Sequence, residues 1–290
     1  MLKLFAGLIR PGQWIKNTVV LAALVFAGEI TSVASVETAL AAMVVFCLLS
    51  SAVYVFNDLI DREQDQQHPL KKMRPIASGR VSPTVAVVLM LILLAVALAG
   101  AYLIGPLFLL VSAAFIVLNL TYTIWLKNIV IVDVMSIGIS FVLRALAGAV
   151  AIDVPASTWM LINTLFLALF LAFGKRRHEL LLLEDSATAH RKILGRYSPY
   201  LLDQLIAVVT PSVVVMYMLY SFSTEVSTKL GTDMLFLTIP FVIYGVFRYL
   251  YLIHKEECGG SPTKVLISDM PILITVVLWI LTVIMVLYVA

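Results

Sequence analysis

Long apolar segments recur along this chain and leave little room for any other kind of structure. Nine of them approach the roughly 20 apolar residues that a helix needs to cross a bilayer, the first being short with an extended polar start. They cover residues 18–28, 37–56, 84–104, 106–125, 129–151, 157–174, 202–222, 234–252 and 270–289. Hydrophobic residues make up 62% of the 290 residues and charged residues 13%, which excludes a water-soluble domain. The sequence predicts an all-α polytopic membrane protein, with residues 1–290 forming a single transmembrane domain.

The basic residues lie almost entirely on one side of these spans. Of the 20 Lys and Arg residues, Arg144 lies inside a span and Lys229 stands alone in a loop on one side. All the others lie in the N-terminal segment or on the opposite side. The positive-inside rule then places the N-terminus in the cytoplasm and the C-terminus outside. We expect a multi-pass protein of the inner (plasma) membrane whose active site faces the cytoplasm, capped by loops 57–83 and 175–201.

A ladder of carboxylates marks the end of the second span. Asp58, Asp61 and Asp65 lie at positions i, i+3 and i+7, so they share one face of a continuing helix. Three carboxylates on one face repel one another unless a cation lies between them, and oxygen ligands of this kind suit Mg²⁺. The pattern predicts a metal–diphosphate site at the membrane surface. The alternative is an ordinary solvated helix end.

Two groups of charged residues accompany this ladder. Lys71 and Arg74 follow it in the same loop and are available to phosphate oxygens. Lys175, Arg176 and Glu179 stand at the end of the sixth span, where Glu179 lies one helical turn from both cations. We predict that they form a second phosphate-binding wall. The alternative is that they only flank the span on its cytoplasmic side.

Five further polar residues lie at or inside the apolar spans. Lys16 and Asn17 open the first span, where an interfacial anchor is the alternative to a binding role. Tyr122 and Lys127 lie around the end of the fourth span, where a lone loop lysine is usually a topology signal. Arg144 lies within the fifth span, so we expect it to face the bundle interior or a wet cavity. A ligand role and a role in capping free carbonyls both remain open for it.

Several of these motifs together resemble the UbiA superfamily of intramembrane prenyltransferases. The resemblance rests on Asn57-Asp58-x-x-Asp61-x-x-x-Asp65 and on Arg74-Pro75-Ile76-Ala77-x-Gly79, and it covers nearly the whole chain. Residues 10–17, 143–148 and 174–176 are similar to the decaprenyl-phosphate phosphoribosyltransferase branch of that superfamily. The implied fold is a UbiA-like bundle of nine transmembrane helices.

The resemblance also implies a reaction and its ligands. 5-Phosphoribosyl 1-diphosphate and a polyprenyl phosphate would give polyprenyl-phosphoryl-5-phosphoribose and diphosphate, with Mg²⁺ as cofactor. Asp58, Asp61 and Asp65 would hold Mg²⁺ on the leaving diphosphate, with Asn57 alongside. The implied partners are the two substrates and the lipid bilayer, with no nucleic acid, and the oligomeric state is left open. The candidate substrate-binding residues are Lys16, Asn17, Asn57, Lys71, Arg74, Tyr122, Lys127, Arg144, Lys175, Arg176 and Glu179.

One departure from the superfamily pattern bears on the choice of donor. Aromatic prenyltransferases of the superfamily carry a second aspartate-rich motif after the sixth span, where this chain has Lys175, Arg176, Arg177 and Glu179. The difference favours a more anionic set of substrates. Two alternatives stay open. One is a transferase that uses a prenyl diphosphate as donor to an aromatic or other acceptor. The other is a transporter, although transporters usually place their polar site near mid-membrane.

Overall fold

The computed structural model of this chain describes residues 2–69, 71–183, 193–256, 260 and 262–288. Helices account for all of its regular structure, and no strand occurs in these residues. Among the described residues, eight helical segments are long and apolar enough to cross a membrane, and the seventh of them includes the short helix η7 (Met234–Thr238). The long α-helices are α3 (Val33–Ile60), α5 (Pro83–Ile104), α6 (Pro106–Ile124), α7 (Val132–Ala151), α8 (Thr158–Leu183), α10 (Pro199–Phe222), α12 (Ile239–His254) and α14 (Met270–Tyr288). The prediction of an all-α membrane protein is confirmed.

Shorter helices connect the long ones. At the N-terminus these are α1 (Leu2–Ile9), the 3-10 helix η1 (Pro11–Leu21), α2 (Ala22–Phe26) and η2 (Glu29–Thr31). The other short helices are α4 (Arg62–Gln67), η3 (Lys71–Met73), η4 (Leu126–Asn128), η6 (Leu194–Arg196), α11 (Thr224–Leu230) and α13 (Pro262–Ser268). Residues 184–192 of the predicted loop 175–201 lie outside the described residues. That loops 57–83 and 175–201 cap a single domain stays a prediction.

The segment expected to form the first span differs from a regular membrane helix. Residues 18–28 are divided between the end of η1, the short helix α2 and the turn that follows. At about 2.0 Å per residue in a 3-10 helix and 1.5 Å in an α-helix, residues 11–26 extend roughly 30 Å, about the thickness of the hydrocarbon core. Only part of this length comes from residues 18–28, and no helix long and apolar enough to cross a membrane lies at these residues, all of which the structure describes. The ninth crossing and the orientation of the two termini stay predictions.

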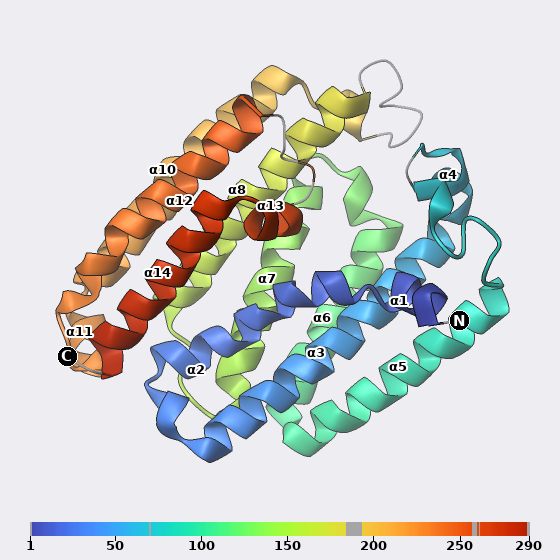
Figure 1. Ribbon diagram of the computed structural model, residues 1–290. Helices are drawn as coiled ribbons and strands as arrows, with labels where there is room; N and C mark the ends of the chain where they lie inside the picture. Colours follow the sequence, from blue (N-terminus) through green and yellow to red (C-terminus); the bar gives the residue numbers. More distant parts are fainter. Residues whose placement is uncertain (1, 70, 184–192, 257–259, 261, 289–290) are drawn as a thin grey trace.

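The N-terminal segment is held against the bundle by close backbone packing. A Cβ atom added to Gly148 of α7 would lie 1.9 Å from the carbonyl oxygen of Val20. No residue other than glycine fits there without displacing η1. On the other side, the Trp14 indole donates a hydrogen bond to Ser51 of α3 at 3.0 Å. Figure 1 shows η1 and α2 passing alongside α3 and α7 in this way.

Several helix boundaries follow from local sequence. Ser82 and Ser198 accept hydrogen bonds from the backbone N–H groups three residues later, and a proline follows each of them as the first helical residue. Between α5 and α6, Gly105 has φ 155°, which turns the chain sharply before Pro106 starts the next helix. These signals could be read from the sequence.

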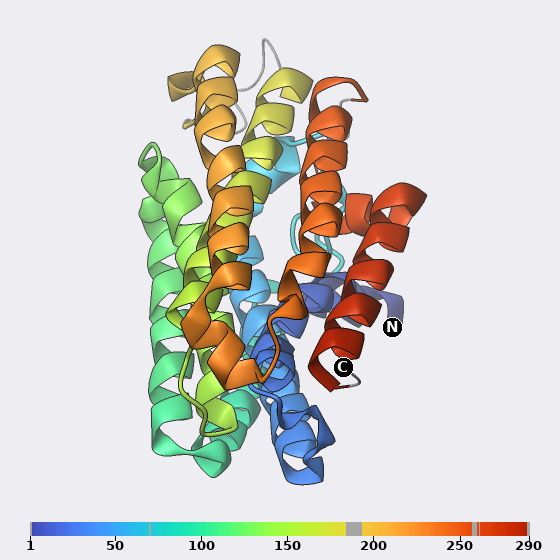
Figure 2. The same ribbon diagram turned by 90° about the vertical axis from the view of Figure 1, so that its left-hand side faces the viewer.

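Helix α7 lies at the centre of the bundle. It packs against α6, α8, α3 and η1, while α5, α10, α12 and α14 lie further out (Figure 1). Its buried positions include many small residues, which allow neighbouring helices to approach closely. Figure 2 shows α6 and α14 on opposite sides of the molecule. Helix α4 lies beyond the end of α3, at the end of the bundle where α8 also ends (Figure 1).

Candidate active site

The carboxylate ladder lies where α3 passes into α4. Helix α3 ends at Ile60, Asp61 forms the turn, and α4 begins at Arg62, so the continuous helix that the spacing suggested is interrupted. The Asp61 side chain does not cap α4, and its carboxylate is bound by Asn57 and Lys127 instead. Asp58 and Asp65 are buried, with 1% and 3% of their surface exposed. Buried carboxylates require partners, and each of the three has one.

Two arginine side chains balance Asp58 and Asp65. Nη2 of Arg10 lies 2.5 Å from Oδ1 and 2.7 Å from Oδ2 of Asp58. Nη1 of Arg74 lies 3.0 Å from Oδ1 of Asp58 and 2.5 Å from Oδ2 of Asp65. The Arg74 guanidinium therefore lies between two carboxylates of the ladder. Burial raises the pKa of Asp65, although the charge of Arg74 acts in the opposite direction.

The third carboxylate has different partners. Asp61 forms an ion pair with Lys127 of η4, and it accepts a hydrogen bond from the Asn57 amide at 3.0 Å. The Asn57 carbonyl oxygen accepts one from Thr123 of α6 at 3.3 Å. The structure thus brings Asn57, Asp61 and Lys127 together, although Lys127 is 66 residues from Asp61 in sequence. Their binding roles stay predictions.

A second charged cluster is built around Arg176 of α8. Nε of Arg176 lies 2.7 Å from Oδ2 of Asp133, and Nη1 lies 2.5 Å from Oε2 of Glu179. Nη2 donates to the Tyr122 hydroxyl at 3.3 Å, and Tyr197 donates to Asp133 at 2.7 Å. Arg176 is only 2% exposed. Its charge is already surrounded by the carboxylates of Asp133 and Glu179 and by the Tyr122 hydroxyl. The geometry favours Arg176 as the centre of this cluster rather than as an exposed phosphate ligand.

The two clusters meet at the end of α6. Tyr122 contacts Arg176, and the next residue, Thr123, contacts Asn57. Consecutive residues of one helix therefore join the ladder to the second cluster.

Burial raises the pKa of Tyr197 above the ordinary tyrosine value, so its hydroxyl keeps its proton and remains a donor to Asp133.

Lys175 and Lys16 differ from these paired cations. Lys175 lies 3.6 Å from Glu179, and its side chain is 42% exposed. Within the described residues, neither a hydrogen bond nor an ion pair reaches the Lys16 ammonium, although Lys175, Arg144 and Arg10 lie close enough to repel it. A partly buried ammonium surrounded by like charges is relieved by a bound anion.

Arg144 occupies the bundle interior, as expected for an ionisable group in a span. Its guanidinium donates to Asn17 at 2.8 Å, to the carbonyl and hydroxyl of Ser140 at 2.9 Å, and to Ser50 at 3.3 Å. It also lies over the ring of Phe115, 4.6 Å from the centroid. All three of its nitrogen atoms are engaged, so the geometry supports a role in joining η1, α3 and α7. A direct ligand role for Arg144 and Asn17 stays a prediction.

Four residues of these clusters were not among the predicted site residues. Arg10 lies in the N-terminal motif at residues 10–17 but had no assigned role, and Asp133 of α7 and Thr123 of α6 were given none either. Tyr197 carried no signal beyond its place in the second loop. Among the predicted residues, Lys71 lies in η3, next to the ladder, where its backbone N–H donates to His68.

The ladder residues offer the type of donor atom that Mg²⁺ binds, but in this structure their oxygen atoms do not converge on one metal position. The available donors are the oxygen atoms of Asn57, Asp58, Asp61 and Asp65, which are the type that Mg²⁺ prefers. The Arg74 guanidinium between two of these carboxylates marks a place where a cation is stable. In the described part of the chain, however, no three acidic, His or Cys side chains converge on one point.

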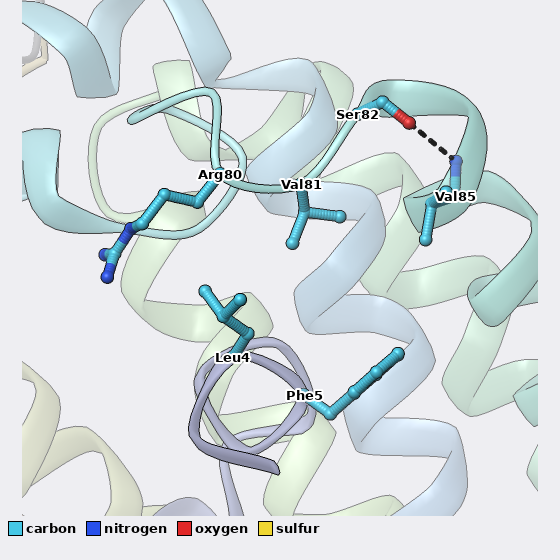
Figure 3. A pocket seen from close by; sticks show the side chains of 6 residues that line it. All are labelled: Leu4, Phe5, Arg80, Val81, Ser82 and Val85. Carbon is cyan, nitrogen blue, oxygen red and sulfur yellow. Dashed lines mark hydrogen bonds between the residues drawn. The ribbon is translucent and has the colours of Figure 1, made fainter. Parts of the chain in front are cut away.

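An apolar pocket lies apart from both charged clusters. Its volume is about 210 Å³, and it opens between α1 and the residues that lead into α5. Figure 3 shows its lining, formed by Leu4, Phe5, Arg80, Val81, Ser82 and Val85. The Ser82 hydroxyl oxygen accepts a hydrogen bond from the Val85 backbone N–H. Apart from Arg80 and Ser82 it offers only apolar side chains.

Comparisons with known proteins bear on this arrangement. The sequence profile of the UbiA prenyltransferase family matches residues 18–268. The decaprenyl-phosphate phosphoribosyltransferase of Corynebacterium glutamicum is 34% identical over 286 residues, covering 97% of this chain and 86% of that protein. The Mycobacterium tuberculosis protein of the same name is 34% identical over 284 residues, covering 95% and 91%.

The fold agrees with this relationship. A UbiA homologue from Archaeoglobus fulgidus, solved bound to GPP and Mg²⁺, superposes with a TM-score of 0.74 at 20% identity, covering 98% of this chain and 99% of that one. An apo UbiA homologue from Aeropyrum pernix gives a TM-score of 0.66 at 17% identity, covering 94% and 98%. This chain is therefore an enzyme, a membrane-embedded transferase that belongs to the UbiA prenyltransferase family.

Proposed function

We propose that the protein transfers 5-phosphoribose from 5-phosphoribosyl 1-diphosphate to a polyprenyl phosphate and releases diphosphate in an Mg²⁺-dependent reaction. One observation carries this proposal: cationic side chains from distant parts of the chain gather around the ladder. Arg10, Arg74 and Lys127 pair with its carboxylates, and Lys16, which lies close enough to Arg10 and Lys175 to be repelled by them, adds a cation that no carboxylate pairs with in the described residues. The names of the relatives that are about one-third identical support the same reaction.

The charges of the substrates explain why such a surplus is useful. The donor carries a diphosphate and a separate 5-phosphate, and the acceptor carries a third phosphate group. One metal site cannot neutralise all three, so further Lys and Arg side chains are required. Lys16 and Lys175 are the best placed for this task because neither is saturated by a carboxylate. A donor with a single diphosphate group would need fewer cations.

The carboxylates would hold the metal. Asp58, Asp61 and Asp65, with the Asn57 oxygen, would be its ligands, and when bound it would neutralise the leaving diphosphate. A UbiA homologue of the same fold was solved with Mg²⁺, which supports a divalent metal in this fold. The role of the surrounding cations is to orient the donor and to stabilise the charge that collects on the leaving group.

The proposed reaction is a substitution at the ribose C1 atom. The bond between the ribose C1 atom and the diphosphate oxygen breaks, and a bond forms from C1 to an oxygen of the acceptor phosphate. The bonding electrons leave with the diphosphate. Because the acceptor phosphate is already an anion, no strong general base is needed. The lipid tail would extend into the bilayer, with the site at the cytoplasmic face of the plasma membrane.

An assay with purified protein tests this proposal. Donor labelled in the ribose is incubated with polyprenyl phosphate and Mg²⁺, and lipid-linked label is measured after extraction into organic solvent. We expect transfer with Mg²⁺, none in EDTA, and recovery when Mg²⁺ is restored. Absence of lipid-linked label while a prenyl diphosphate is consumed would instead favour the prenyltransferase alternative.

A further inference from the structure

The pairing of Asp58 and Asp65 has a consequence for how a metal can reach them. Both oxygens of Asp58 accept hydrogen bonds from Arg10, and Oδ1 also accepts one from Arg74. Oδ2 of Asp65 accepts a hydrogen bond from Arg74 at 2.5 Å. The oxygens that would coordinate a metal therefore hold guanidinium groups. A divalent cation that binds these carboxylates therefore competes with the guanidinium groups for their oxygen atoms and for their negative charge.

The two arginines are placed so that they can leave. Their side chains are 22% and 24% exposed, whereas the carboxylate side chains of Asp58 and Asp65 are 1% and 4% exposed. Neither arginine lies in a long helix. Arg10 stands at the break between α1 and η1, and Arg74 follows η3. Each can therefore swing its side chain while the helices that carry the carboxylates stay in place.

The backbone at Arg10 supports a special role for this residue. Its φ angle is 51°, in the left-handed region that residues other than glycine seldom adopt. The conformation precedes Pro11 and points the side chain at Asp58, while the guanidinium lies 5.2 Å from the centre of the Tyr54 ring. Strained backbone of this kind is often found at functional sites.

We propose that Arg10 and Arg74 hold the ladder in place of the metal and pass to the diphosphate oxygens when the metal–diphosphate arrives. This inference rests on the proposed function and assigns Arg10 a ligand. Each guanidinium exchanges a carboxylate for a phosphate, and both are good bidentate partners. The carboxylates are then released for the metal. Binding of metal and diphosphate is thereby coupled, since either one alone must work against the existing ion pairs.

The coupling gives the arginine variants opposite effects on two ligands. In Arg10→Gln and Arg74→Gln, a competing cation is removed from the carboxylates, so a divalent cation alone should bind more tightly. The same substitutions remove a phosphate partner, so inorganic diphosphate should bind more weakly in the presence of saturating metal. An arginine with only a structural role would not produce this pair of changes.

Mn²⁺ binding to the purified full-length protein, followed by electron paramagnetic resonance, provides the measurement. We expect Mn²⁺ alone to bind each variant at least about threefold more tightly than it binds wild type. Diphosphate should bind each of them about tenfold more weakly with Mn²⁺ saturating. Arg80→Gln is the matched control: Arg80 lies in the same loop, and its guanidinium donates to Met73 and Ser78 rather than to the ladder. Both affinities should stay at the wild-type value there.

Thermal melting covers the case of a destabilised variant. Loss of Arg74 removes the guanidinium that pairs with Asp65, and loss of Arg10 leaves Asp58 with Arg74 alone, so each substitution should lower Tm. Saturating Mn²⁺ should raise Tm more in the variant than in wild type. Mn²⁺ affinity that is unchanged or weaker in both variants, without this rescue, would overturn the exchange. If Asp58→Asn binds Mn²⁺ as tightly as wild type, the metal assignment in the proposed function fails as well. The two failures are therefore distinguishable.

Discussion

Asp61 is the ladder carboxylate whose substitution is easiest to interpret. Its described partners are Lys127 and Asn57, and its side chain is 18% exposed, so Asp61→Asn removes a charge without disturbing the pairs that Arg10 and Arg74 form with the other two carboxylates. We expect kcat to fall at least about 100-fold because a metal ligand and its charge are lost. The stability loss should stay near 1 kcal/mol, typical of a partly exposed ion pair. Kinetics and melting of the purified variant measure both, and near-normal turnover at limiting Mg²⁺ would remove Asp61 from the metal site.

The lysines without saturating partners are the residues that should govern use of the donor. Lys16→Ala and Lys175→Ala should each lower kcat/KM for the phosphoribosyl donor about tenfold or more, the cost of one charge-assisted phosphate contact. Lys229→Ala removes an equal charge at the far side of the predicted membrane and should have no effect. If kinetics are unchanged for both test variants, these lysines act only in topology.

At the scale of single residues, the sequence shows which residues share one helix face, but it does not show which residues of other helices they contact. The i, i+3, i+7 pattern singled out Asp58, Asp61 and Asp65 as a group in need of cations, and in the structure each of them pairs with an Arg or Lys side chain. The identity of those cations depends on contacts such as Arg10 with Asp58, which are 48 residues apart. Nothing in local periodicity reports such a contact. The same holds for Tyr197 and Asp133, 64 residues apart.

Among the elements, the contact between η1 and α7 offers a direct test of packing. In Gly148→Ala the new methyl group would meet the Val20 carbonyl, so η1 must move away from α7. We expect Tm to fall by about 5 °C or more, since overpacking typically costs 1–3 kcal/mol. Activity should fall as well because η1 carries Lys16.

Gly245→Ala is the control for that substitution. Gly245 also lies in a helix, α12, but its added Cβ would meet only Thr275 at 4.0 Å. Alanine should be neutral there, or stabilising by up to about 1 kcal/mol from helix propensity. Equal Tm values for Gly148→Ala and wild type would show that η1 does not depend on this close approach.

The long helices could be predicted because length and apolar content alone define them, and their boundaries carry Ser, Pro and Gly signals. The N-terminal segment could not be predicted at the same level. Its 3-10 geometry leaves no clear 3.6-residue period, and its position depends on Gly148 and Arg144, which lie more than 120 residues away. The break at Asp61 was missed for a related reason, because one turn residue hardly alters the helical spacing.

For the whole molecule, the charge asymmetry predicts which end faces the cytoplasm. In a chain whose native cysteines are replaced, Ser78→Cys should resist a membrane-impermeant thiol reagent added to intact cells, and Thr228→Cys should react. Both positions are exposed in the structure, so access depends on the side of the membrane alone. The reverse pattern would invert the topology and place the ladder outside.

The central claim is the identity of the donor, and diphosphate release tests it most directly. The same purified protein is offered either 5-phosphoribosyl 1-diphosphate with polyprenyl phosphate, or a prenyl diphosphate with an aromatic acceptor, each with Mg²⁺. Wild type should release diphosphate from the phosphoribosyl donor only, and Asp61→Asn should release it from neither. Release from the prenyl diphosphate, with none from the phosphoribosyl donor, would contradict the account.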